Sequence, residues 1–183
     1  MLTKARIAGH PLHPMLIAFP VAMYVATLVA LIVYYAGSHD PFWYRAAFWT
    51  NLAGIVMAAV AAVPGLVDLL GLPRGSRARL TGVRHAGFNV LALLLFVLSD
   101  ILIGRGLTRG TYALAAPFVL VVLGCAATVC AGWLGWTLVQ THHVGVKPTT
   151  HAFGDGDSSA VDDLDELVPP RAPLAPSDLP LRH

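Results

Sequence analysis

The sequence predicts an all-α integral membrane protein, a polytopic four-helix bundle followed by a disordered C-terminal tail. Three observations predict this fold class. Of the 183 residues, 56% are hydrophobic and only 12% are charged, whereas soluble domains carry about 25% charged residues. Four apolar stretches are long enough to cross a bilayer, which takes about 20 residues. The composition then changes sharply after Lys147, where the chain becomes acidic and rich in proline.

The four predicted membrane helices belong to one transmembrane domain over residues 1–147. They cover about residues 15–36, 46–70, 85–103 and 113–140. The intervening segments are rich in glycine, proline and charged residues, which are typical of turns. The sequence shows no evident internal repeat and no inverted repeat.

The distribution of Lys and Arg predicts how the helices are oriented. The N-terminal segment, the second loop and Lys147 together hold seven of these cations, whereas the first and third loops hold three. Short loops on the cytoplasmic side of membrane proteins are enriched in Lys and Arg. We therefore expect both termini in the cytoplasm and the lipid bilayer as the main partner. Because the basic residues are confined to short loops between apolar stretches, nucleic acid is excluded as a partner.

The C-terminal segment, residues 148–183, differs from the rest of the chain. It contains seven acidic residues and two arginines, with a proline-rich stretch at its end. Such a segment cannot bury enough apolar surface to offset the entropy of ordering. We therefore predict a disordered acidic tail, which is solvated or serves as a docking arm.

Most of the ionisable residues outside the tail are expected at one side of the membrane. In an antiparallel bundle, the starts of the first and third helices lie beside the ends of the second and fourth. Five of the eight histidines fall at these positions, together with one of the three acids of the transmembrane domain. The candidate residues are His10, His13, Asp68, His85 and His142, with His143 next to the last of them.

These residue types point to a cofactor. A neutral imidazole nitrogen can bind haem iron or a transition metal, and two histidines on facing helices are enough for haem. The candidate cofactor ligands are His10, His13, His85 and His142. In a metal site, Asp68 would join them, or it would accept a hydrogen bond that orients a histidine. We prefer His142 to His143 because its helix face carries small residues, which usually pack against neighbouring helices.

Several motifs resemble a bacterial membrane family catalogued as domain of unknown function 2231. The segment Gly9–Pro14 reads His-Pro-Leu-His-Pro after its glycine and resembles the opening signature of the family. Pro64–Asp68, His85 and the Gly132–Val139 segment that leads to His142 resemble later parts of it. His143 stands where family members tend to have glycine. The resemblance covers about residues 7–146 and implies four helices in the bacterial inner membrane.

The resemblance also implies a redox setting, because some relatives carry fused cytochrome c or iron–sulfur domains. Our leading hypothesis is therefore a membrane module that binds haem b or a transition metal for electron transfer, alone, as a homo-oligomer or with a redox protein partner. Two alternatives stay open: a proton- or metal-coupled transporter or channel, and a structural or assembly subunit without a cofactor. The sequence contains no phosphate-binding loop, no Gly-x-Ser-x-Gly and no HExxH motif, so nothing predicts a stand-alone enzyme.

Overall fold

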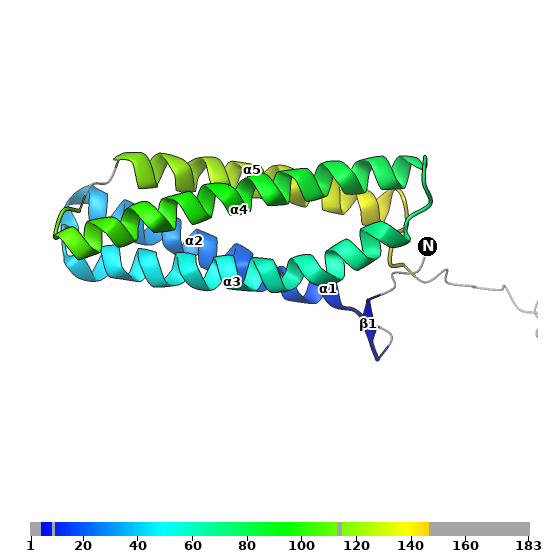
Figure 1. Ribbon diagram of the computed structural model, residues 1–183, viewed down its shortest axis with the longest axis horizontal. Coiled ribbons are helices and arrows are strands. Elements are labelled where there is room, and N and C mark those ends of the chain that lie inside the picture. The colour runs from blue at the N-terminus through cyan, green and yellow to red at the C-terminus, as the bar shows by residue number, and fades with distance from the viewer. Residues whose placement is uncertain (1–4, 9, 113–114, 147–183) are drawn as a thin grey trace, which may run out of the picture. The chain divides into compact units, whose positions relative to one another are not determined.

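The fold is a bundle of four long helices, as Figure 1 shows for the computed structural model. The structure describes residues 5–8, 10–112 and 115–146. The chain divides into two units, Met1–Lys147 and Pro148–His183, and every described residue belongs to the first. The predicted tail lies outside the described residues.

A small antiparallel ribbon and three helical segments make up the first part of the chain. The ribbon pairs β1 (Arg6–Ile7) with β2 (His10–Pro11). Helix α1 (Leu12–Leu16) leads into α2 (Ala18–Val33), which ends in a π-helical turn, η1 (Tyr34–Ser38).

The other three helices are longer: α3 (Pro41–Gly71), α4 (Arg77–Arg109) and α5 (Ala115–Gln140). Local signals set their ends. The carboxylate of Asp40 accepts a hydrogen bond from the Phe42 amide at 2.8 Å, and the Ser76 hydroxyl accepts one from the Arg79 amide at 3.1 Å. Both are N-terminal caps. Helix α4 ends at Gly110, whose φ of 66° is the left-handed conformation that glycine adopts readily.

The predicted fold class is confirmed, since four helices are long and apolar enough to cross a membrane. The first three helical regions extend beyond the predicted ranges, most of all α4, which starts at Arg77 rather than at His85, whereas α5 ends at Gln140 as predicted. Its 33 residues correspond to about 50 Å of helix, which is longer than the hydrocarbon layer of a bilayer, about 30 Å. A hydropathy pattern marks only the apolar part of such a helix, whereas the Ser76 cap sets its start. His85 therefore lies in the third turn of α4.

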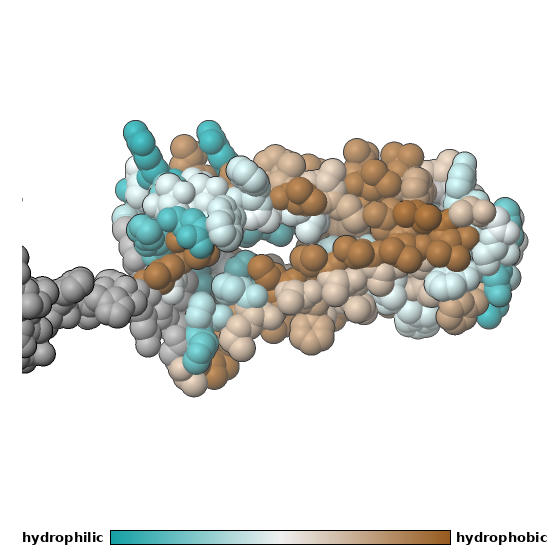
Figure 2. Space-filling model, turned by 180° about the vertical axis from the view of Figure 1, so that it is seen from behind, coloured by the Kyte–Doolittle hydropathy of each residue, from teal (hydrophilic) through white to brown (hydrophobic). Residues whose placement is uncertain are grey.

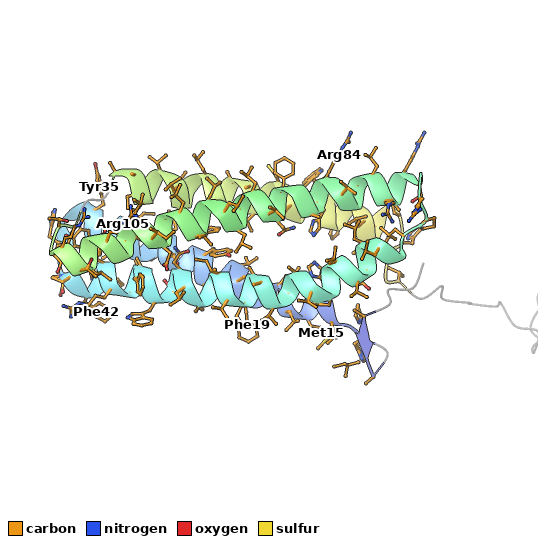
Figure 3. All side chains as sticks on the ribbon, viewed as in Figure 1. Met15, Phe19, Tyr35, Phe42, Arg84 and Arg105 are labelled. Carbon is orange, nitrogen blue, oxygen red and sulfur yellow. The ribbon has the colours of Figure 1, made fainter. Side chains whose placement is uncertain are left out.

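The surface of the bundle matches a lipid environment. Figure 3 shows Met15, Phe19 and Phe42 projecting away from the bundle, and all three side chains are more than half exposed. Apolar side chains cover most of the length of the face seen in Figure 2, and hydrophilic residues gather at the two ends. The core is formed by fully buried side chains from all four helices, among them Leu31, Tyr44, Phe96 and Val121.

The bundle contains an internal repeat of two helical hairpins, α2 with α3 and α4 with α5. Buried positions of α2 recur 72 residues later in α4, and those of α3 recur 70 residues later in α5. The buried pairs are Pro20 and Ala92, Tyr24 and Phe96, Thr27 and Ser99, Leu31 and Ile103, Ala47 and Pro117, Asn51 and Val121, Gly54 and Gly124, and Ala61 and Ala131. The residue types differ in most pairs, which explains why the repeat is not evident in the sequence.

One of these pairs, and a further pair with the same spacing of 72 residues, meet across the bundle. The rings of Tyr24 and Phe96 stack with centroids 3.5 Å apart and planes 7° from parallel. His13 and His85, also 72 residues apart, have ring centroids separated by 6.0 Å. A residue that contacts its own equivalent lies near a two-fold axis. Because both hairpins begin at the same end of the bundle, this pseudo-two-fold axis runs along the helices, as in membrane proteins with parallel repeats.

Candidate two-histidine site

His13 is held against α3 by a glycine and a backbone carbonyl. Its Nδ1 lies 2.8 Å from the carbonyl oxygen of Ala61. A Cβ atom on Gly65 would stand only 2.8 Å from the same nitrogen, so the imidazole can lie this close because glycine has no side chain. The short helix α1 begins directly after Pro11, whose fixed φ restricts the backbone before His13.

His85 repeats this arrangement in the second hairpin. Its Nδ1 lies 2.8 Å from the carbonyl oxygen of Ala131 on α5. The glycine beneath the ring is Gly135, where a Cβ atom would stand 3.2 Å from Cε1. In both hairpins the accepting carbonyl belongs to an alanine four residues before the glycine. The pseudo-two-fold axis therefore relates the two imidazoles together with the groups that hold them.

The carbonyl contacts fix the protonation of both rings. A carbonyl oxygen only accepts hydrogen bonds, so each Nδ1 must carry a proton, and in a neutral imidazole this leaves the lone pair on Nε2. The ring planes of His13 and His85 are perpendicular. Nε2 of His85 lies 3.1 Å from Nδ2 of Asn89, so the amide donates to this lone pair. A neutral histidine whose other nitrogen donates to a carbonyl is typical of a metal ligand.

The other predicted site residues lie at the same end of the bundle but have other partners. His10 is exposed, and its Nδ1 lies 3.0 Å from the Ala8 carbonyl. A carboxylate oxygen of Asp68 accepts a hydrogen bond from the Ala5 amide at 2.9 Å, which ties the β1 segment to α3. Nε2 of His142 lies 3.2 Å from the Thr81 hydroxyl on α4. Of the predicted set, the structure thus joins His13 and His85 as a pair.

The structure also places His143 and the small residues of α5, on which the preference for His142 over His143 depends. His143 follows the end of α5 with a φ of 51°. The stripe of small residues on the His142 face of α5 packs inward at Gly124, which lies against the Phe96 ring, and at Gly135, which lies against His85. Among residues 5–8, 10–112 and 115–146, no group of three or more His, Cys, Asp or Glu side chains is placed to hold a metal ion.

The bundle is hollowed towards one end. Figure 2 shows an opening between the two rows of helices, nearer to the end that carries the β1 segment and the histidines than to the opposite end. The space between the hairpins at this end is bordered by α1 and α3 on one side and by α4 and α5 on the other, as the histidine contacts show.

The sequence analysis assigns no role in a site to four polar or small residues that the structure makes important. Gly65 and Gly135 were visible as helix glycines, and their spacing of four from an alanine is a signal that could have identified them. The other two residues are Asn51 and Asp100, which are buried in the core between the helices. Asp100 lies inside α4, and the burial of its face depends on neighbours that a single sequence does not reveal.

Comparison with known proteins identifies a family. No curated protein and no solved structure matches this chain. A family model described as a predicted membrane protein, DUF2231, matches residues 9–148. This match covers about three quarters of the chain, including all four helices and both histidines of the pair. The protein is therefore a member of the DUF2231 family of membrane proteins.

Proposed function

We propose that the His13–His85 pair binds haem b and that the protein transfers electrons in the membrane. The observation that carries this proposal is the matched pair of imidazoles. Both donate Nδ1–H to a backbone carbonyl, and their ring centroids lie 6.0 Å apart across the pseudo-two-fold axis. An iron atom between two imidazoles, with each Fe–N bond about 2.0 Å long, needs ring centroids about 6 Å apart.

The number of ligands favours haem over a metal ion bound by side chains alone. Structural metal sites such as those for zinc usually need four protein ligands, and catalytic ones three. The described residues bring only two histidines together, and no group of three candidate ligands is present among them. Haem supplies four nitrogens from its own ring and needs only two from the protein. A transition metal with further ligands from outside the described residues is the alternative.

The residues around the pair fit axial ligands with one exception. The carbonyl oxygens of Ala61 and Ala131 would orient the imidazoles, and Gly65 and Gly135 would leave room for the rings. Asn89 donates to the lone pair of His85, so its amide would have to turn away when His85 binds iron. Bound haem would supply a one-electron redox centre. The protein would hold it at the end of the bundle, within reach of a redox partner.

An absorption spectrum tests the proposal. The protein is purified in mild detergent, and its spectrum is recorded oxidised and reduced, with elemental analysis for iron and other metals. We expect a Soret band in the wild type that is lost in His13→Ala and in His85→Ala. His10→Ala and His142→Ala are matched controls from the same end of the bundle and should keep the band. The absence of both a Soret band and stoichiometric metal in the wild type would refute the proposal and leave the transport and assembly hypotheses.

We also propose that the histidine end faces the cytoplasm of a bacterial cell, with the bundle in the inner membrane. Arg74, which lies between α3 and α4, and the arginines at the start of α4 lie at this end. Tyr34, Tyr44 and Tyr112 pack together at the opposite end. In a variant without Cys125 and Cys130, cysteines introduced by Arg74→Cys and Arg109→Cys test the orientation, since both positions are exposed. A membrane-impermeant thiol reagent added to intact spheroplasts should label position 109 only. Labelling of position 74 instead would reverse the orientation.

A further inference from the structure

The core contains a buried polar pair, Asn51 on α3 and Asp100 on α4. The Asn51 side chain is completely buried, and Asp100 is 9% exposed. Asp100 lies nine residues before the end of α4, which corresponds to about 14 Å of helix. This pair is separate from the histidine site, because His85 is fifteen residues earlier in α4, about 22 Å along its axis.

The orientation of Asn51 is fixed by the backbone of α4. The amide nitrogen of Asn51 donates a hydrogen bond to the carbonyl oxygen of Phe96 at 3.0 Å. The other polar atom of this amide group is the side-chain oxygen Oδ1, which can only accept a hydrogen bond. Phe96 and Asp100 are four residues apart and therefore lie on the same face of α4. The two side chains are thus neighbours inside the bundle.

Both side chains nevertheless have an oxygen without a donor. Within the described part of the chain, Oδ1 of Asn51 and Oδ1 of Asp100 are buried and have no hydrogen-bond partner. Both oxygens are acceptors if Asp100 is ionised. Burying an ionised carboxylate without a partner in a membrane interior is very costly, and each buried acceptor without a donor adds to this cost.

No charged group nearby offsets this cost. Among the described residues, no Lys, Arg or His forms an ion pair with Asp100, and Oδ1 of Asp100 has no hydrogen-bond partner. On α4 itself, the next cation, Arg105, is exposed. The other titratable side chains of the core include Tyr24 on α2 and Cys125 on α5, and neither carries a charge that could pair with a carboxylate. The Ser99 hydroxyl donates its hydrogen bond to the Pro117 carbonyl oxygen of α5, so it does not donate to Asp100.

The internal repeat shows that packing does not need polar residues at these positions. The residue equivalent to Asp100 in the first hairpin is Leu28, which packs against the core. The residue equivalent to Asn51 in the second hairpin is Val121, which is completely buried. The same backbone environment is therefore filled once by an apolar pair and once by a polar pair. Polar groups kept in a membrane core at such a cost usually have a function.

We propose that Asp100 and Asn51 form a binding site for one exchangeable proton inside the membrane-spanning bundle. A proton on Oδ1 of Asp100 makes the acid neutral and turns this oxygen into a donor. The O–H group then donates to Oδ1 of Asn51, so a single proton satisfies both orphaned oxygens. The site does not depend on the proposed haem, and either proposal can fail without the other.

Infrared spectroscopy tests this site directly. We expect the difference spectrum between wild type and Asp100→Asn, both reconstituted in lipid at neutral pH, to contain the carbonyl band of a protonated carboxylic acid. The band should move to lower frequency in D₂O, because the proton is exchangeable, and Asn51→Val should change its frequency by removing the acceptor. Labelling the wild type with ¹³C-carboxyl aspartate should also shift the band, which gives a test that needs no variant.

Two controls complete the design. Asp40→Asn is the matched control, because Asp40 is an exposed cap of α3 and asparagine caps equally well, so this variant should keep the band. The double variant Asp100→Leu and Asn51→Val copies the apolar pair of the repeat and should fold with unchanged or higher thermal stability. A spectrum with carboxylate bands only, in particular bands that respond to sodium ions, would overturn the proton site. Failure of the double variant to fold would also overturn it, because the pair would then serve packing.

Discussion

Replacement of Gly65 by alanine tests how tightly His13 is held. A Cβ atom at Gly65 would stand 2.8 Å from Nδ1 of His13, whereas ordinary van der Waals contact begins at 3.4 Å. The imidazole must therefore move by about 0.6 Å, which stretches its 2.8 Å hydrogen bond to Ala61 to as much as about 3.4 Å. This is beyond the usual N–H···O range of about 2.7–3.2 Å.

The equivalent change in the second hairpin should be milder. At Gly135 the nearest atom of His85 would lie 3.2 Å from the new Cβ, so a shift of about 0.2 Å is enough. The 2.8 Å hydrogen bond to Ala131 then stays within the normal range. Gly132 on the same helix has nothing within 4 Å of its added Cβ, and Gly132→Ala is the matched control.

The expected energies follow from these distances. Loss of the hydrogen bond costs about 1 kcal/mol, and a strained rotamer adds about 0.5–1.5 kcal/mol. Alanine returns up to about 1 kcal/mol through its helix propensity. Gly65→Ala should therefore lower the free energy of unfolding by about 0.5–1.5 kcal/mol, while Gly135→Ala should be close to neutral and Gly132→Ala neutral or stabilising.

Unfolding of the purified protein in mixed detergent micelles, followed by circular dichroism, measures this order. Gly65→Ala should be the least stable of the three variants. If Gly65→Ala were as stable as Gly132→Ala, the close packing of His13 on α3 would be incorrect, and with it the geometry of the histidine pair.

Three further predictions use other contacts. Tyr24→Phe should leave the free energy of unfolding unchanged or raise it by up to about 1 kcal/mol. The buried hydroxyl has no partner among the described residues, while the ring stacks on Phe96. A loss of stability of more than about 1 kcal/mol would show that the hydroxyl forms a hydrogen bond. Asp68→Ala should speed tryptic cleavage after Arg6, because it removes the acceptor for the Ala5 amide. Asp68→Asn keeps an acceptor and should be cleaved at the wild-type rate. Equal cleavage rates for the wild type and both variants would contradict the idea that this hydrogen bond holds the β1 segment against α3. Thr27→Val should lower the free energy of unfolding, measured by thermal unfolding, by no more than about 1 kcal/mol. The reason is that Thr27 and Thr50, whose hydroxyls contact each other, each also bond to a carbonyl of their own helix. A larger loss would show that the contact between the two hydroxyls holds α2 to α3.

The candidate site illustrates which parts of such a protein can be predicted from one sequence. The placement of His10, His13, Asp68, His85 and His142 at one end follows from helix number and direction alone. Which of them meet does not follow, because this depends on helix rotation and on the longer range of α4. The haem or metal assignment and the cytoplasmic orientation stay predictions. His142, Asp68 and His10 each bond to a nearby group instead of joining the pair.

The sequence by itself determined the fold class, the number of spans and the end of the bundle at which the histidines lie, because hydropathy and turn residues are local properties. Only the tertiary structure decided that His13 and His85 face each other on glycines, that the two hairpins are related by a pseudo-two-fold axis, and that Asp100 is buried beside Asn51. These features depend on which helix faces pack together. The contacts that make up these features join residues 45 to 72 positions apart in the chain, and no pattern within one helix specifies them.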